Sequence, residues 1–199
     1  MKKDNSTFLK KKWLRNRMLG YVDSPVVMET HGGYGKLFGA CYADIQSGVV
    51  FEKDPKKAGV LGLQRPTWSV YEADCIEAIK DGAGNHLPVN FLDIDPYGSP
   101  WDVVDAFFNG KREYMPQMVI VVNDGLAQKL KLGGAWSTGA LRGIVEKYGN
   151  DLFSRYLEVC EELLTEKVLG AGYIVQNFFG YYTGHGKQIT HYAAILKKR

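Results

Sequence analysis

Residues 89–100 read Val-Asn-Phe-Leu-Asp-Ile-Asp-Pro-Tyr-Gly-Ser-Pro. The first seven of these residues are apolar and β-branched enough for a buried central strand that ends at Asp95. Pro96 and Gly98 then favour a tight turn, and an apolar helical pattern follows over Trp101–Asn109. This succession of strand, turn and helix predicts an α/β fold with a parallel sheet.

The same alternation of strand and helix surrounds this unit. Four more short apolar runs that end in polar residues are predicted strands: Val26–Glu29, Val49–Glu52, Ser69–Asp74 and Met118–Asn123. Helical patterns lie between them at Lys36–Ser47, Pro55–Gln64 and Cys75–Asp81. Because helices connect parallel strands across the sheet, the pattern predicts a Rossmann-like sheet with helices on both faces.

The C-terminal part of the chain alternates less regularly. Gly125–Gly143 is rich in small residues and is predicted to be a loop with a short helix. Asp151–Val168 is a predicted amphipathic helix that Asp151 would cap. Two strands, Tyr173–Phe178 and Ile189–Leu196, are predicted to form a hairpin that closes one edge of the sheet.

Length and cysteine content bound the class of protein. A chain of 199 residues fits one globular domain. The three cysteines, Cys41, Cys75 and Cys160, lie far apart and have no metal-ligand spacing, so we expect reduced thiols, no metal site and a cytoplasmic protein. The sequence has no apolar run long enough for a signal peptide or a membrane span, and we expect no membrane partner.

Positive charge is concentrated at the N-terminus. The first 17 residues carry seven cations and one acid, a local charge of +6 in a chain whose total is +3. Residues 1–20 are therefore predicted to form a basic helix or arm beside a single domain over residues 21–199. Such a segment favours an anionic partner, above all nucleic acid, and makes Lys11 and Lys12 candidate substrate contacts. A solvated helix or tail is the alternative.

Four acidic residues recur at nearly constant intervals along the chain. Glu29, Glu52, Asp74 and Asp95 are separated by 23, 22 and 21 positions, and each ends a predicted strand. Because the C-terminal ends of parallel strands share one edge, these carboxylates are predicted to converge where open α/β sheets bind ligands. A single strand-end carboxylate is weak evidence, since such residues often cap the next helix.

The first of these acids begins a glycine-rich loop, Glu29-Thr30-His31-Gly32-Gly33-Tyr34-Gly35. Glycines at this point let the backbone approach a ligand closely. The loop is not a phosphate-binding loop, because Leu37 stands where a Ser or Thr would hold magnesium. It also departs from the dinucleotide fingerprint, because Phe38 takes the place of the third small residue.

The next two acids suit a nucleoside. A carboxylate at Glu52 can accept hydrogen bonds from both ribose hydroxyls. Asp54, followed by Pro55, is better explained as the cap of the next helix. Asp74 can accept from the exocyclic amine of an adenine or, equally well, can cap a helix.

The turn Asp95-Pro96-Tyr97-Gly98 suits a planar amine. Asp95 can accept one N–H of the amine and the Pro96 carbonyl can accept the other, which makes the nitrogen more nucleophilic. Tyr97 can stack on the ring that carries the amine, and Gly98 permits the tight turn.

In these residues the chain resembles class I S-adenosylmethionine-dependent methyltransferases, over roughly residues 22–124. Asp95-Pro96-Tyr97-Gly98 resembles the Asp/Asn-Pro-Pro-Tyr/Phe signature of enzymes that methylate exocyclic amines, and is most similar to Asp-Pro-Phe-Gly of the tRNA guanine N2-dimethyltransferases. The resemblance implies a seven-stranded, mostly parallel sheet with the last strand antiparallel. It also implies a set of residues for S-adenosylmethionine: Glu29, His31, Gly33, Gly35, Glu52 and Asp74.

The resemblance has two departures. His31 stands where many members carry the first glycine of the loop. The tRNA enzymes also carry an additional C-terminal domain, for which this sequence has no room. Methyl transfer is therefore implied more directly than a tRNA substrate.

The predicted function is methyl transfer from S-adenosylmethionine to an exocyclic amine of a nucleic-acid base, with tRNA-like RNA favoured over DNA. Asp95, Pro96 and Tyr97 would carry the chemistry, and Tyr97, Gly98, Lys11 and Lys12 would contact the substrate. A methyltransferase for DNA adenine or another substrate and a non-catalytic cofactor-binding subunit remain alternatives. His185 and His191 flank the last strand, where they either contact substrate or are structural, and Gly133–Gly139 and Tyr181–Lys187 are candidates for the substrate rim.

Overall fold

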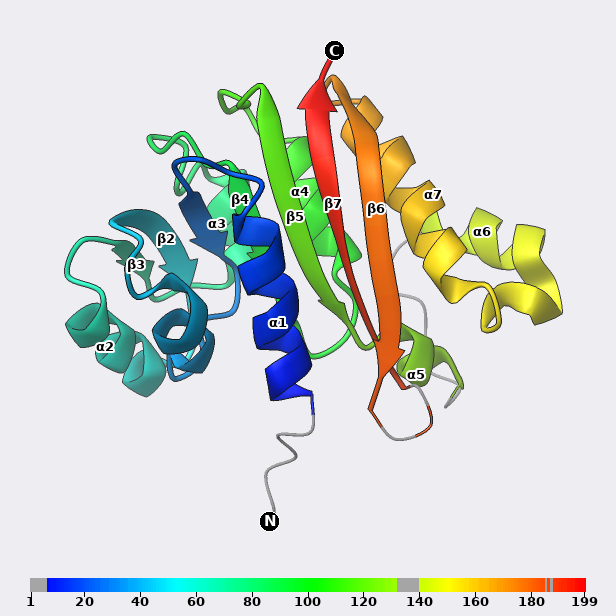
Figure 1. The fold of residues 1–199 in the computed structure, drawn as a ribbon, viewed down its shortest axis with the longest axis horizontal. Coiled ribbons are helices and arrows are strands. Elements are labelled where there is room, and N and C mark those ends of the chain that lie inside the picture. The colour runs from blue at the N-terminus through cyan, green and yellow to red at the C-terminus, as the bar shows by residue number, and fades with distance from the viewer. Residues whose placement is uncertain (1–6, 132–139, 185, 187) are drawn as a thin grey trace.

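The computed structural model describes residues 7–131, 140–184, 186 and 188–199. These residues form a seven-stranded sheet in the order β3-β2-β1-β4-β5-β7-β6 (Figure 1). The strands are β1 (Val26–Glu29), β2 (Ser47–Phe51), β3 (Ser69–Tyr71), β4 (Phe91–Ile94), β5 (Gln117–Asp124), β6 (Tyr173–Thr183) and β7 (Ile189–Lys198). β1 to β5 pair in parallel, and β7 lies antiparallel between β5 and β6. The predicted mostly parallel sheet with its last strand antiparallel is confirmed.

Helices cover both faces of the sheet. One face packs on α1 (Phe8–Leu19), the π-helix η1 (Phe38–Tyr42) and α2 (Pro55–Gln64). The other face packs on α3 (Cys75–Lys80), α4 (Trp101–Phe108), α5 (Leu126–Lys131), α6 (Ala140–Tyr148) and α7 (Tyr156–Leu169). Figure 1 shows α1 in front of the middle of the sheet, with α4 and α7 behind it.

Alternation along the central strands builds two separate cores. In β5, Val119 and Val121 pack with the α1 face, whereas Met118, Ile120 and Val122 pack with the α4 and α7 face. All five side chains are at most 1% exposed. A sheet that is covered on both faces in this way needs strands that are apolar throughout, and the sequence provides them.

The N-terminal basic segment forms a helix that packs on the sheet. Leu14, Arg15 and Met18 of α1 are buried, although this helix carries several charged residues. Leu14 and Met18 share a core with Val27 of β1 and Phe91 of β4. From residue 7 onward the segment is therefore part of the packed body and not a free arm.

Several predicted elements differ from the structure in their bounds. The expected helix Lys36–Ser47 is reduced to a short stretch around η1, because β2 already begins at Ser47. The helix expected over Asp151–Val168 was also wrong at its start, since Asp151 lies in a 3₁₀ turn (η2, Gly149–Leu152) and α7 begins at Tyr156.

The region Gly125–Gly143 contains the whole of α5 and the start of α6, where one short helix was predicted. Its residues 132–139, which include the rim candidate Gly133–Gly139, lie outside the described part of the chain. No helix within the described ranges is long and apolar enough to cross a bilayer.

Candidate active site

The C-terminal ends of the parallel strands meet at one edge of the sheet. The N-terminal end of α1, α5 and the connection between β6 and β7 lie at the same edge, at the bottom of Figure 1. The four predicted acids lie there, Glu29 as the last residue of β1 and Glu52, Asp74 and Asp95 after β2, β3 and β4. The charges of Asp95, Glu52 and Asp74 all act on His31, so these three carboxylates face a common region, although each of the four acids has different bonding partners.

Glu29 is buried and paired with an arginine. Its Oε2 lies 2.6 Å from Nη1 of Arg65, and both side chains are at most 1% exposed. The Arg65 guanidinium also lies over the rings of Phe38, at 4.2 Å, and Trp68, at 5.0 Å. Burial raises the pKa of Glu29 to about 7, although the nearby Arg65 charge lowers it. Glu29 is therefore a buried, paired carboxylate at the end of β1, where the glycine-rich loop begins.

The glycine-rich loop is tied to Glu52. The Gly33 amide donates to Oε2 of Glu52 over 2.8 Å, and the Asp54 amide donates to Oε1 over 3.0 Å. Gly33 and Gly35 have φ of 54° and 72°, which L side chains rarely adopt. A Cβ added to Gly33 would meet no atom within 4 Å, so the space above the loop is open. Since a carboxylate offers about four lone-pair sites, Glu52 keeps acceptor capacity for a ligand.

His31 and Asp74 flank this loop. His31 Nδ1 lies 2.8 Å from the Thr30 hydroxyl, and its Nε2 lies 3.9 Å from Sγ of Cys75. Burial lowers the pKa of His31, which keeps the imidazole neutral. Asp74 is exposed and accepts from the Ile76 amide over 2.9 Å, as a cap of α3. Its alternative interpretation as a helix cap is therefore correct, and its contact with a ligand stays a prediction.

Asp95 is covered by α1. The Lys11 ammonium donates to Oδ1 and Oδ2 of Asp95 over 2.7 and 2.9 Å, and Asn123 Nδ2 donates to Oδ1 over 2.6 Å. The side chains of Lys11 and Asp95 are 20% and 15% exposed. Burial opposes ionisation of Asp95, but the charges of Lys11 and Arg15 outweigh it and hold the pKa of Asp95 below its ordinary value. Lys11 is thus an ion-pair partner of Asp95 in this structure, whereas Lys12 is half-buried beside it.

A second acid on β4 was missed in the sequence. Asp93 accepts from Nε and Nη2 of Arg15 over 2.7 and 2.5 Å and from the Tyr42 hydroxyl over 2.6 Å. Arg15 and Asp93 are at most 1% exposed. The spacing of the charged residues could have indicated this pair. Four helical residues span about 6 Å, and two strand residues span about 6.6 Å. Cations at 11 and 15 therefore match acids at 95 and 93 on a helix that runs antiparallel to β4.

A polar row crosses the sheet beside Asp95. Asn123 of β5 pairs with His191 of β7, which pairs with Tyr181 of β6. The Tyr181 hydroxyl donates to the Lys10 carbonyl over 2.8 Å and lies 3.3 Å from His191 Nδ1. Nδ1 is therefore the protonated ring nitrogen, and Nε2 is left as an acceptor. Burial, together with the charges of Lys11 and Arg15, lowers the pKa of His191 to about 3, so the ring is neutral.

Two acceptors in this row are unused. His191 Nε2 and Asn123 Oδ1 are buried and have no hydrogen-bond partner among the described residues. His191 is 1% exposed and Asn123 is 5% exposed. A buried acceptor without a donor is costly, so this row favours a ligand that donates hydrogen bonds. The sequence had left His191 open between a substrate contact and a structural role, and His185 lies outside the described residues.

The turn after β4 presents an aromatic ring to solvent. Tyr97 is fully exposed, and Pro96 and Gly98 are half-buried. Gly98 has φ of 142°, and its carbonyl accepts from the Gly125 amide over 3.2 Å. This bond ties the turn to the end of β5 while the Tyr97 ring remains free to contact a ligand.

A hollow on the described surface lies away from this edge. It has a volume of about 790 Å³ and is lined by residues such as Lys80, Asn85, Asp105 and Lys111. α3 and α4 both end there, so it belongs to the edge opposite the strand-end carboxylates. We do not assign the site to it, because its lining holds none of the predicted site residues.

Comparison with known proteins identifies the fold. No protein-family model and no curated protein sequence matches the chain. Among solved structures, Trm1 from Pyrococcus horikoshii in complex with S-adenosyl-L-methionine superposes with a TM-score of 0.70 at 13% identity, over 96% of this chain and 55% of Trm1. The N-methyltransferase NodS from Bradyrhizobium japonicum WM9, in complex with S-adenosyl-l-homocysteine, gives 0.65 at 10% identity, over 98% of this chain and 89% of NodS.

A third structure has the same arrangement. TYW2 from M. jannaschii, in complex with AdoMet, gives a TM-score of 0.58 at 14% identity, over 100% of this chain and 79% of TYW2. The chain therefore has the Rossmann-like fold of these methyltransferases and spans about half the length of Trm1. At these identities the likeness concerns the fold.

Proposed function

We propose that this protein is an S-adenosylmethionine-dependent methyltransferase that acts on an exocyclic amine of a nucleic-acid base, with RNA favoured. The observation that carries the proposal is the pairing of two features at one sheet edge. The loop that holds Gly33 and Glu52 suits the nucleoside part of a cofactor, and the turn Asp95–Gly98 suits an amine. The fold shared with methyltransferase structures supports this assignment.

The residues proposed for the cofactor suit its nucleoside part. Glu52 would hold the ribose hydroxyls, Asp74 would contact the adenine amine, and the backbone from His31 to Gly35 would line the remaining part. The open space above Gly33 and the free acceptor capacity of Glu52 support this placement. When bound, S-adenosylmethionine supplies a methyl group on positively charged sulfur. Glu29 would act indirectly, by holding the loop through Arg65.

Asp95 would orient the target amine. The carboxylate accepts one N–H, the Pro96 carbonyl accepts the other, and Asp95 or water receives the proton that the nitrogen loses as its new N–C bond forms. Lys11 now occupies both oxygens of Asp95, so the substrate amine would have to displace it. The Lys11 side chain is long and partly exposed, which leaves it room to turn into solvent. Tyr97 would stack on the base.

The proposal is tested by transfer of a labelled methyl group. Purified protein is incubated with labelled S-adenosylmethionine and separate pools of tRNA, ribosomal RNA, DNA and protein. We expect label in RNA, and digestion to nucleosides then identifies the methylated amine. Label only in DNA or protein would move the assignment to another substrate class, and cofactor binding without transfer to any pool would support the non-catalytic subunit.

Two variants separate cofactor binding from chemistry. Asp95→Ala should bind S-adenosylmethionine normally but lose roughly 10²–10⁴ in turnover, the range for a positioned acid–base group. Glu52→Ala should weaken cofactor binding by about 1.5–3 kcal/mol, through the loss of a charged acceptor. Isothermal titration and single-turnover methylation measure the two effects. Wild-type turnover in Asp95→Ala would refute the amine site.

A further inference from the structure

Aromatic and cationic side chains form a continuous surface between α1 and β6. Lys10, Trp13 and Arg17 of α1 and Phe179 and Tyr181 of β6 make up this α1–β6 surface. The Trp13 ring centroid lies 5.7 Å from that of Phe179 and 5.9 Å from that of Tyr181. The Arg17 guanidinium lies 4.9 Å from the Phe179 ring and 5.4 Å from the Trp13 ring, and the Lys10 ammonium lies 6.0 Å from the Tyr181 ring.

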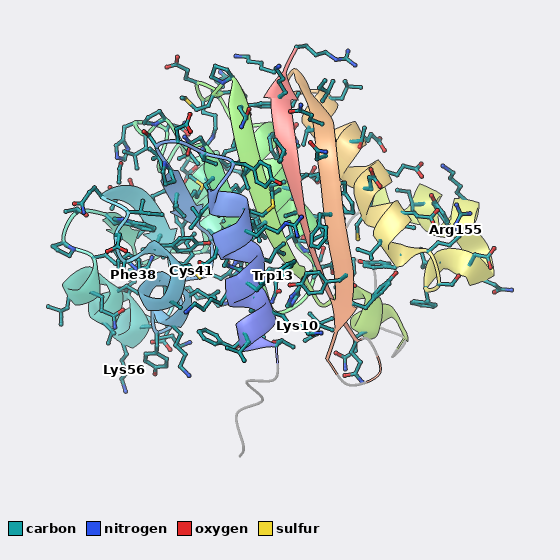
Figure 2. All side chains as sticks on the ribbon, viewed as in Figure 1. Lys10, Trp13, Phe38, Cys41, Lys56 and Arg155 are labelled. Carbon is teal, nitrogen blue, oxygen red and sulfur yellow. The ribbon has the colours of Figure 1, made fainter. Side chains whose placement is uncertain are left out.

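The surface is open to solvent. Trp13 is 48% exposed, an unusual amount for a tryptophan, and Lys10 and Arg17 are exposed as well. Figure 2 shows Trp13 and Lys10 on the side of α1 that faces β6. The ring planes at Trp13 are held by their neighbours, so a flat ligand finds a preformed aromatic face.

The charge of the surface has a single sign. Neither α1 nor β6 contains an acidic residue. Lys11 and Arg15 of the same helix are neutralised by Asp95 and Asp93. Lys10 and Arg17 form no ion pair with any described residue, so their charges are free for an external anion. Repeated cations beside exposed aromatic rings are the combination that binds single-stranded nucleic acid, since phosphates meet the cations and bases stack on the rings.

The surface leads directly to the proposed amine site. The Tyr181 hydroxyl bonds to the Lys10 carbonyl, and the next residue, Lys11, holds Asp95. Arg17 and Lys11 are six residues apart, about 9 Å along the helix. A short unpaired stretch of a few nucleotides lying on α1 would therefore end beside Asp95.

We propose that the α1–β6 surface binds single-stranded RNA next to the nucleotide that is methylated. This inference rests on the proposed function, since it concerns the substrate of the same site, but it makes a separate claim about where the strand lies. The unpaired cations favour a polyanionic partner. The exposed rings favour a single strand, because a base inside a duplex would not reach them.

The test measures binding without methylation. A fluorescently labelled single-stranded oligoribonucleotide and the same sequence as a duplex are titrated with the full chain. The titrations use a Trp136→Phe background, since Trp136 lies outside the described residues. We expect tighter binding of the single strand and quenching of tryptophan fluorescence, because among the described tryptophans Trp13 is exposed whereas Trp68 and Trp101 are buried. The quenching should be lost in Trp13→Phe, which should keep most of the affinity because a ring remains.

Substitutions then locate the strand. Trp13→Ala should weaken single-strand binding roughly 5- to 150-fold, the effect of losing one stacked base. Arg17→Ala and Lys10→Ala should each make the slope of log affinity against log salt shallower by about 0.7, one phosphate contact on a single strand. Matched controls lie on α2, away from this surface: Leu63→Ala removes an exposed apolar side chain, and Lys56→Ala removes an exposed cation. Neither should change binding.

The outcomes separate the two proposals. Unchanged affinity and salt slope in Trp13→Ala, Arg17→Ala and Lys10→Ala would overturn the α1–β6 surface, even if RNA is methylated. Tighter binding of the duplex than of the single strand would contradict the proposal that unpaired bases stack on this surface. If Trp13→Ala is unstable by circular dichroism, Trp13→Phe and Lys10→Ala still test the proposal through quenching and salt dependence. Failure of RNA methylation with intact RNA binding would instead count against the proposed function alone.

Discussion

Two ion pairs join α1 to β4, one helical turn apart, and they differ in burial. Arg15 and Asp93 are 1% and 0% exposed, and Asp93 also accepts from Tyr42. Lys11 and Asp95 are 20% and 15% exposed, and Lys11 ends in a flexible ammonium. The first pair is a bidentate guanidinium–carboxylate contact in a dry core, whereas the second lies where water can enter.

The difference separates a structural contact from an exchangeable one. Breaking a buried pair leaves a charge without solvent, which costs several kcal/mol. A pair that water can reach costs less to break, since solvent-exposed ion pairs contribute only roughly 0–1 kcal/mol. We therefore interpret Arg15–Asp93 as the anchor of α1 and Lys11–Asp95 as a contact that a substrate amine can replace.

A third carboxylate at the same edge extends the comparison. Asp124, at the end of β5, is buried and accepts from the Leu126 amide over 2.7 Å and from the Tyr156 hydroxyl over 3.0 Å. No cation pairs with it among the described residues, and burial raises its pKa to about 7. Asp95, which pairs with Lys11, therefore has a pKa below its ordinary value, whereas Asp124, which has no cationic partner among the described residues, has a raised one.

The largest expected effect is on the buried pair. Arg15→Met should lower the free energy of unfolding by about 3–5 kcal/mol, because Asp93 would remain as a buried, unpaired charge. Chemical denaturation measures this loss. Arg17→Met, on the same helix, should cost only about 0.5–1 kcal/mol, the range of an exposed cation–π contact. Equal losses in the two variants would contradict the anchor role.

The double variant Arg15→Met/Asp93→Leu sharpens the same point. It removes both charges and replaces them with apolar side chains, so it should be more stable than Arg15→Met alone. A double variant no more stable than the single one would show that lost packing, not the unpaired carboxylate, causes the instability.

A smaller effect is expected in the pH dependence of the free energy of unfolding. Because the pKa of Asp124 is raised to about 7 in the folded state, the folded protein binds more protons than the unfolded chain between the ordinary aspartate pKa and pH 7. The free energy of unfolding should therefore fall as pH rises through this window, and stay level above it. Asp124→Asn should remove the part of this fall that Asp124 causes and leave the part that Glu29 causes, since burial raises the pKa of Glu29 to about 7 as well. Denaturation at pH 5, 6, 7 and 8 compares the two proteins, and parallel curves would exclude Asp124 as the titrating group.

A smaller loss of stability than at the buried pair is expected for the partly exposed pair. Lys11→Met should cost no more than about 1 kcal/mol at neutral pH, because water can solvate Asp95. The loss of the cation should raise the pKa of Asp95. On acidification, the stability that ionised Asp95 contributes should then be lost at a higher pH than in the unsubstituted protein. The acid limb of the pH profile of methylation should shift to higher pH for the same reason. An unmoved acid limb would exclude Asp95 as the group that must be ionised.

The pattern of apolar and acidic residues was sufficient to predict the seven strands and most of the helices, although not all of their bounds. Strand-end acids at regular intervals also placed the edge correctly, because parallel strands must end on one side. Asp54 was correctly predicted as the cap of α2, since Asp before Pro satisfies the first free amides. These features depend on the local geometry of strands, turns and helix ends, which is the same at each strand–helix unit of an α/β chain.

The partners of the acids depended on the tertiary structure. Glu29 and Asp95 have the same type of position in the sequence, yet Glu29 pairs with Arg65 inside the sheet face and Asp95 pairs with Lys11 at the open edge. Two lysines of the basic N-terminal segment also differ in their partners. Asp95 neutralises Lys11, whereas Lys10 lies on the α1–β6 surface. Such pairings join residues 36 to 84 positions apart. Sequence spacing fixes which side of an element a residue occupies, but only the packing of α1 and α2 on the sheet decides which charge it meets.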